Sequence, residues 1–128
     1  MIPIKDDCYT RSGMYCACIE FRLDEHRRHG FQTSQLIDYT LEPSPDAEAD
    51  NGGRAQAPPQ KLVVAFSTAD VVVLGWQLER LADLLRKNDL ATVHILPKPS
   101  GEVNPLKSFI ASIEITPIEK ALPGNVVL

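Results

Sequence analysis

The chain has 128 residues, of which 44% are hydrophobic and 23% are charged, and its formal net charge is −4 at pH 7. This length suits a single domain, 1–128, that buries its own apolar core, and the composition is that of an ordinary globular protein. The acidic balance argues against general nucleic-acid binding, which depends on clustered lysines and arginines.

The apolar segments and the cysteine count predict a compartment. Within residues 1–13 no apolar segment follows the single lysine, Lys5, so we expect no secretory signal. The densest apolar run, VVVLGW at 71–76, is far shorter than the roughly 20 residues that span a bilayer. Three cysteines are an odd number, which fits reduced thiols better than a secreted disulfide framework. We therefore predict a cytoplasmic protein that does not bind membranes.

The first half of the chain predicts an antiparallel pair of strands. Residues 14–23 alternate between two faces, as a strand requires, and the polar segment 24–30 ends in glycine, as a hairpin loop often does. A second extended segment covers 31–42 and is closed by Pro43, because proline cannot donate to a ladder. Residues 43–60 contain four prolines, two glycines and no large apolar side chain, which predicts a disordered loop within the one domain.

The second half predicts further strands and one helix. The β-branched run 61–76 is interrupted by STAD at 67–70, which predicts two short strands joined by a tight turn. Over about 76–88 the spacing changes to that of an amphipathic helix, with cations near its end. Its apolar face comprises Leu78, Leu81, Ala82 and Leu85. Two more strands are predicted at 91–96 and 109–116. In the latter, the side chains expected to face inward are Phe109, Ala111, Ile113 and Ile115.

These elements predict an α+β fold, in which a largely antiparallel sheet of about six strands packs on the helix at 76–88. The alternative is a small α/β doubly wound fold that uses 71–96 as strand, helix and strand. That fold needs helices on both faces of its sheet, and the sequence predicts only one helix.

The cysteines raise the question of a metal site. Cys16 and Cys18 share one face of the first predicted strand, about 7 Å apart at two strand rises. Zinc ligands usually come in pairs two to four residues apart on a turn, with a second pair elsewhere. The C-x-C spacing therefore favours small side chains on a half-buried strand. The alternative is a metal-binding or small-ligand protein, with an enzyme among the options, in which His26 and His29 complete the ligand set.

Two other features are candidate binding sites. The loop sequence HRRH, comprising His26, Arg27, Arg28 and His29, has the basic side chains that bind anions, although Asp24 and Glu25 offset its charge. Together with Arg22 and Phe31, these arginines also form the weaker option of a nucleic-acid site. Trp76, the only tryptophan, is placed at the helix start and can anchor a partner.

The sequence contains no phosphate-binding glycine loop, dinucleotide fingerprint or nucleophile elbow, so it suggests no catalytic residues and no cofactor. Apolar residues occupy both phases of Lys61–Trp76, as in a sheet covered on both faces. One helix covers one face, and a second copy of the chain can cover the other. We therefore predict a non-enzymatic interaction module that associates with itself, as a dimer, or with another protein.

Overall fold

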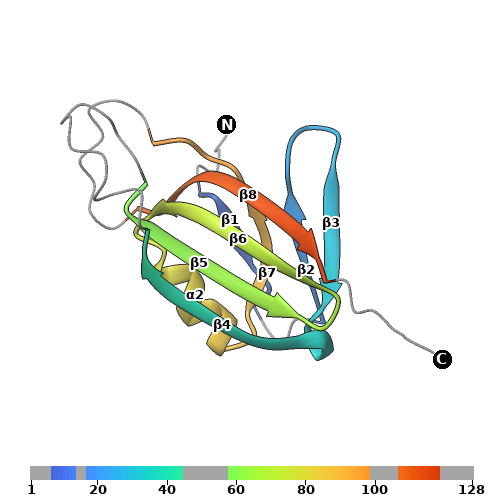
Figure 1. The fold of residues 1–128 in the computed structure, drawn as a ribbon. Helices are drawn as coiled ribbons and strands as arrows, with labels where there is room; N and C mark the ends of the chain where they lie inside the picture. Colours follow the sequence, from blue (N-terminus) through green and yellow to red (C-terminus); the bar gives the residue numbers. More distant parts are fainter. Residues whose placement is uncertain (1–6, 14–16, 45–57, 99–106, 119–128) are drawn as a thin grey trace.

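The computed structural model describes residues 7–13, 17–44, 58–98 and 107–118, which form two four-stranded sheets and one α-helix (Figure 1). Sheet A has the order β1 (Tyr9–Arg11), β7 (Leu90–His94), β2 (Cys18–Arg22), β3 (Arg28–Gln32). Sheet B has the order β4 (Leu36–Pro43), β5 (Gln60–Phe66), β6 (Ala69–Trp76), β8 (Phe109–Pro117). The helix is α2 (Glu79–Arg86), and a 3-10 turn (Thr33–Gln35) joins β3 to β4. The predicted α+β class is confirmed, but the single six-stranded sheet is wrong, because the strands divide between two sheets.

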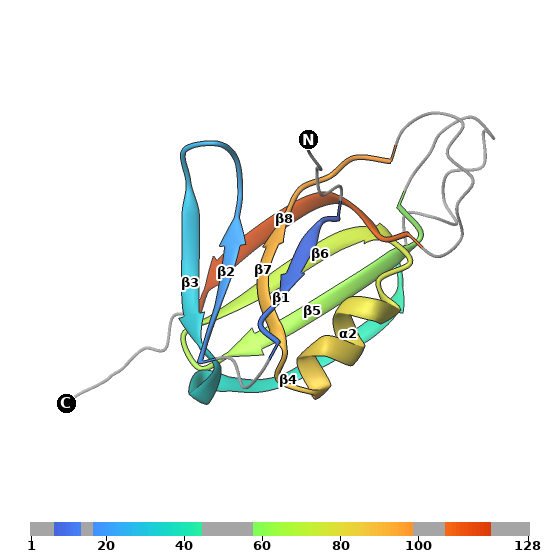
Figure 2. The same ribbon diagram turned by 180° about the vertical axis from the view of Figure 1, so that it is seen from behind.

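Sheet A and α2 lie on the same face of sheet B (Figure 2), and the core fills the space between them. Three phenylalanines join the two sheets. The ring of Phe31 in sheet A stacks on Phe66 in sheet B with centroids 4.2 Å apart, and Phe21 meets both rings edge-on at 6.0 and 6.2 Å. Such aromatic pairs contribute roughly 0.5–1.5 kcal/mol beyond the area they bury. These contacts attach the hairpin β2–β3 to sheet B at the end of β5, where Phe66 is the last residue.

The first half of the chain departs from the prediction at the 3-10 turn. The predicted hairpin is confirmed for β2 and β3, which pair from Cys18↔Gln32 to Arg22↔Arg28. However, β3 begins at Arg28, inside the predicted loop, and β4 pairs with β5 in the other sheet. The segment 31–42 is therefore not one extended strand. Side chains alternate on both sides of the turn, so periodicity alone does not reveal the change of sheet.

The predicted pair of strands within 61–76 is confirmed, because β5 and β6 form an antiparallel hairpin. The turn is shorter than predicted, since Ala69 and Asp70 already belong to β6. Residues 14–16 of the first predicted strand, and 45–57 of the predicted loop, lie outside the described residues.

The helix is shorter than the predicted 76–88. Trp76 is the last residue of β6, and Gln77 has a positive φ of 56°, which separates the strand from the helix. The backbone N–H of Leu78 donates to Gln60 Oε1 (2.6 Å), so a side chain from β5 caps the helix start. Its buried face comprises Leu81, Leu84 and Leu85. No helix in the described ranges is long and apolar enough to cross a membrane.

The doubly wound alternative is wrong. The strands on either side of α2, β6 and β7, belong to different sheets, so they do not form the strand–helix–strand unit of that fold. The pairs within sheet B are all antiparallel, and among the described strands only β2 and β7 run parallel.

A bulge changes which residues of β8 face the core. Ile113 and Ile115 pack on the core as predicted, but Leu74 pairs with Ser112 whereas Gly75 pairs with Ile110. One residue, Ala111, is therefore extra, and the alternation changes phase. Ile110 therefore joins the core cluster, whereas Phe109 is buried, as predicted, but lies outside that cluster.

Candidate functional site

The outer face of sheet B is turned away from sheet A and α2 (Figure 1). Its two central strands carry an apolar patch on this face. Strand side chains alternate, so the buried Leu62 and Val64 on β5 and the buried Val71 and Val73 on β6 leave the intervening residues outward. These residues, which we call the outer patch, are Val63, Ala65, Val72, Leu74 and Trp76. All are half-buried, and none of the described elements lies over them.

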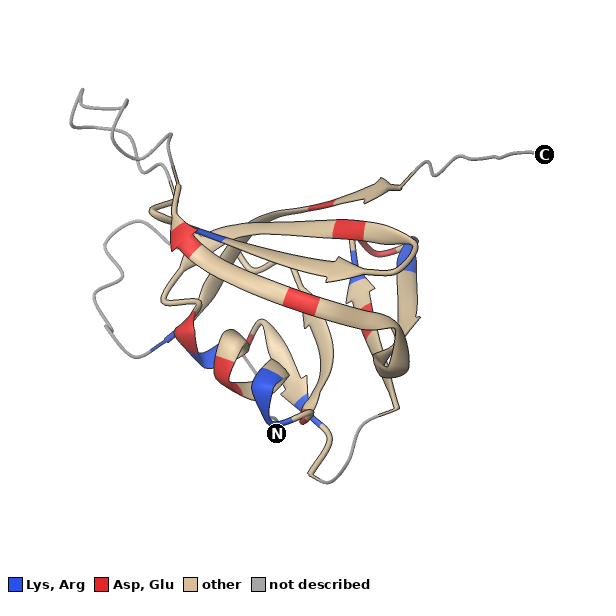
Figure 3. Cartoon of the chain, turned by 60° about the horizontal axis from the view of Figure 1, so that its bottom comes forward, with Lys and Arg blue, Asp and Glu red and all other residues tan. Residues whose placement is uncertain are grey.

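Polar side chains on the edge strands flank the outer patch at three levels. The rows are Asp38–Ala65–Asp70–Thr116, Thr40–Val63–Val72–Glu114 and Glu42–Lys61–Leu74–Ser112. Strand β4 thus presents carboxylate, hydroxyl and carboxylate where β8 presents hydroxyl, carboxylate and hydroxyl. Lys61 is the one cation in these three rows, and its Nζ lies 3.8 Å from Glu42 Oε2. Acidic positions predominate over basic ones along the strands of sheet B (Figure 3).

The structure places Trp76, a predicted binding residue, at the end of β6 in the outer patch and not at the helix start. It shares its strand face with Val72 and Leu74. Its role in binding stays a prediction, but its position joins it to the patch that the sequence suggested only through two-phase apolar spacing.

The HRRH residues do not form one site. Asp24 Oδ1 accepts the backbone N–H groups of His26 and Arg27, and Asp24 Oδ2 accepts Arg27 Nε, each at 2.8 Å. These hydrogen bonds, first that from His26, hold the pKa of Asp24 below its usual range. Arg27 is thus used within the turn, and His26 is 88% exposed at its tip.

The other two residues of this motif lie on opposite faces of β3. His29 shares the phase of Phe31 and stacks on its ring with centroids 4.4 Å apart. Arg28 has the other phase, so it projects from the outer face of sheet A.

The cysteines and histidines predicted as metal ligands are not brought together where they are described. Cys18 is exposed on the outer face of sheet A, whereas His29 belongs to the opposite face of the same hairpin. Cys8 is fully buried, and burial raises the pKa of its thiol to about 12, which disfavours the thiolate that a metal needs. Within the described ranges, no three His, Cys, Asp or Glu side chains are grouped to hold a metal ion. Cys16 lies outside the described residues, so the C-x-C hypothesis stays a prediction.

A second surface feature is a row of basic side chains across the outer face of sheet A. Arg22 on β2 pairs with Arg28 on β3 and, in the parallel register, with His94 on β7. Neighbouring strands are about 4.8 Å apart, so the three side chains are close neighbours. Arg22 and His94 are far apart in the sequence, and only strand pairing aligns them.

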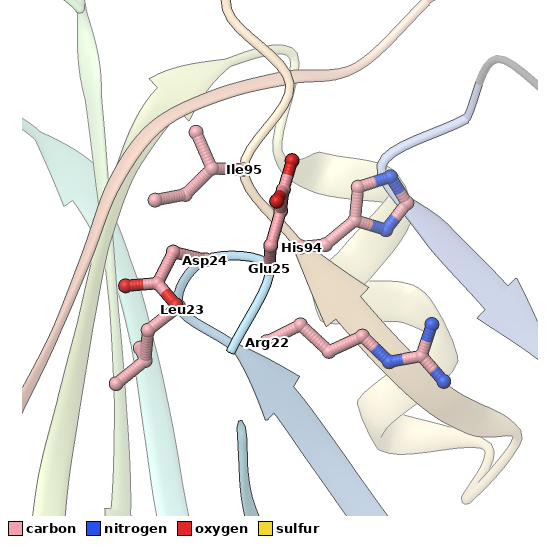
Figure 4. A pocket seen from close by; sticks show the side chains of 6 residues that line it. All are labelled: Arg22, Leu23, Asp24, Glu25, His94 and Ile95. Atoms are coloured by element: carbon pink, nitrogen blue, oxygen red, sulfur yellow. The ribbon is translucent and has the colours of Figure 1, made fainter. Parts of the chain in front are cut away.

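This row borders a shallow hollow of about 370 Å³ at the end of the sheet. It is lined by Arg22, Leu23, Asp24, Glu25, His94 and Ile95. Figure 4 shows Arg22 and His94 projecting to one side of the turn and Leu23 and Asp24 to the other. The hollow therefore has a basic side, with Arg22 and His94, and a mixed side, where the carboxylate of Asp24 lies beside Leu23.

No family model, curated protein or solved structure matches this chain. The molecule presents two outer faces, of which that of sheet B is apolar at its centre and that of sheet A is polar.

Proposed function

We propose that this protein is a non-enzymatic interaction module that forms a two-fold dimer through the outer face of sheet B. The observation that supports it is the outer patch of half-buried apolar side chains on β5 and β6, with no described element over it. A contiguous apolar surface of this kind typically marks a site of protein association.

The pattern around the patch favours a second copy of the chain as the occupant. A two-fold axis parallel to the strands, between β5 and β6, brings β5 over β6 of the partner copy and β4 over β8. Val63 of each copy then faces Val72 of the other copy. Packed sheets lie about 10 Å apart and cross at about 30°, so the match is closest at this central level.

The same axis places every flanking carboxylate opposite a hydroxyl. Thr40 faces Glu114 of the second copy, and in the same way Asp38 faces Thr116 and Glu42 faces Ser112. A two-fold axis perpendicular to the strands instead places Glu114 opposite Glu114 of the second copy. It also places Glu42 opposite Asp38 of the second copy. Because like charges in an interface are repelled, the axis parallel to the strands is favoured.

The test is the oligomeric state, measured by sedimentation equilibrium and native mass spectrometry over a range of protein concentration. Val72→Lys places a charge at the centre of the interface and is expected to raise the dimer dissociation constant by about a hundredfold or more. Gln32→Lys adds the same charge on the exposed edge of sheet A and leaves the dimer unchanged. A wild-type chain that is monomeric at every concentration contradicts the proposal.

A second variant tests the orientation. Thr40→Lys places a cation opposite Glu114 of the other copy in the proposed arrangement, so it strengthens the dimer. With the axis across the strands, the new lysine faces itself and weakens the dimer. A weakened Thr40→Lys dimer therefore rules out the proposed axis.

A further inference from the structure

The outer face of sheet A carries two arginines whose guanidinium groups are held in place but not fully used. Arg22 Nε donates to Glu20 Oε1 (2.8 Å), and Arg28 Nη1 lies 3.8 Å from the same oxygen. The Glu20 side chain is 29% exposed, whereas Arg22 and Arg28 are 46% and 60% exposed. One partly buried carboxylate therefore sits between two exposed guanidiniums, with a hydrogen bond to Arg22 and an ion-pair contact to Arg28.

The outer ends of these guanidiniums have capacity for further hydrogen bonds. The only described hydrogen bond of the Arg22 side chain uses Nε, which leaves its two Nη groups available among the described contacts. A guanidinium has five N–H donors in a planar fork that matches the oxygens of phosphate. Neighbouring strands lie about 4.8 Å apart, so the guanidinium forks of Arg22 and Arg28 can converge on one tetrahedral oxyanion.

The row itself favours an anion, although the protein as a whole is acidic and the carboxylates of Asp24 and Glu25 line the adjoining hollow. Two arginines and one glutamate give this row a net charge of +1 without counting His94, which extends it on β7. The neighbouring carboxylate of Asp24 is turned to the other side of the turn, where it is bonded to Arg27 (Figure 4).

The hollow beside the row suggests what the anion is attached to. Its volume of about 370 Å³ lies within the range of small-molecule sites, and Leu23 and Ile95 add apolar side chains to its lining. The carboxylate of Glu25, which also lines it, is 90% exposed and can accept hydrogen bonds from hydroxyl groups. A carboxylate repels a second anionic group, so the remainder of the ligand is neutral and hydroxylated.

From these contacts we infer that the outer face of sheet A binds a small phosphate monoester that carries hydroxyl groups. The phosphate contacts Arg22 and Arg28, Glu20 acts as a positioning residue, and the hydroxylated part occupies the hollow. This site lies on the face turned away from sheet B, so it is separate from the proposed dimer interface (Figure 2).

The test is isothermal titration calorimetry of the full chain at low ionic strength with ribose 5-phosphate, inorganic phosphate and ribose. We expect ribose 5-phosphate to bind more tightly than inorganic phosphate, and ribose to give no detectable binding. Arg22→Gln and Arg28→Gln each remove a charged donor from an exposed side chain. Each is expected to raise the dissociation constant for ribose 5-phosphate by about tenfold or more.

The matched control is Arg86→Gln, which removes the same charge from an exposed side chain on α2 and is expected to leave the affinity unchanged. Equal weakening in all three variants shows general electrostatic attraction and overturns the site. Absence of ribose 5-phosphate binding to the wild-type chain also overturns it. If inorganic phosphate binds as tightly as ribose 5-phosphate, the assignment of the hollow is wrong. Val72→Lys retains binding if the two faces act independently, so failure here is distinguishable from failure of the dimer.

Discussion

Gly75 lies where the backbone of β8 closely approaches β6, and replacing it with alanine tests the bulge that changes which residues of β8 face the core. A Cβ atom at this position lies 2.1 Å from the carbonyl oxygen of Phe109 and 3.1 Å from Ile110 Cα. Both obstructing atoms are backbone, so neither moves away by a side-chain rotation. The strands must therefore separate by about 1 Å or more to restore an ordinary contact.

The expected cost follows from what that separation disrupts. Overpacking a close contact costs roughly 1–3 kcal/mol, and weakening the ladder at the last pairs, Gly75↔Ile110 and Trp76↔Phe109, adds about 1–2 kcal/mol. The smaller entropy of the unfolded alanine chain offsets about 0.4–1 kcal/mol of this. We expect Gly75→Ala to lower the free energy of unfolding by about 2–4 kcal/mol and the melting temperature by roughly 6–15 °C.

Gly30→Ala is the matched control, because this glycine also lies within a strand. The nearest atom to a Cβ at Gly30 is Cys18 Sγ at 3.2 Å, which is the end of a rotatable side chain, and the next is 3.9 Å away. We expect a change within about 0.5 kcal/mol for this variant. Urea unfolding followed by circular dichroism measures both. If Gly75→Ala is as stable as Gly30→Ala, β6 and β8 do not approach as described and the bulge is misplaced.

Three further predictions concern the thiols, the carboxylates and the helix cap. Iodoacetamide at pH 8 should alkylate the exposed Cys18 in the native protein but not Cys8, because burial raises the pKa of the Cys8 thiol to about 12. Equal labelling rates of the two cysteines in peptide mass spectrometry would contradict this. Hydrogen bonds, led by that from the Gly13 backbone, lower the pKa of Asp89, so its stabilising effect is complete above its unfolded pKa of about 3.9 and is lost as the pH falls further. In urea titrations Asp89→Asn should therefore reduce stability at pH 7 and flatten the loss of stability in acid, and an unchanged pH profile refutes it. Gln60→Ala removes the acceptor for the Leu78 N–H and should lower the free energy of unfolding by about 1 kcal/mol. Gln35→Ala, at a side chain with no described hydrogen bond, is the control. Equal urea midpoints for the two variants argue against the cap.

Local patterns in the sequence were sufficient wherever a segment's neighbours are close in the chain. The hairpin β5–β6 follows from two β-branched runs around a short turn, and the inward face of α2 follows from leucines three and four residues apart. The β2–β3 pair was also predicted, because its turn is polar and both strands alternate. These features need only the period of the side chains and the preferences of turn residues.

The division into two sheets was decided by tertiary structure. The 3-10 turn at Thr33–Gln35 sends the chain from sheet A to sheet B without interrupting the alternation on either side, so no local signal marks it. The bulge opposite Gly75 likewise changes the phase of β8 through a contact between strands that are distant in sequence. In both cases the cause is a non-local pairing that the period of one strand does not contain.

The same division separates the candidate sites. The apolar spacing of 61–76 indicated a second covered face, but only the register of β4 and β8 revealed the alternating carboxylates and hydroxyls around the outer patch. The HRRH segment looked like one basic site, yet hydrogen bonds to Asp24 occupy Arg27, and strand alternation separates Arg28 from His29. Arg28 instead aligns with Arg22 and His94 across three strands. Residue types were determined by the sequence alone, whereas their convergence depends on strand pairing, which is a property of the folded chain.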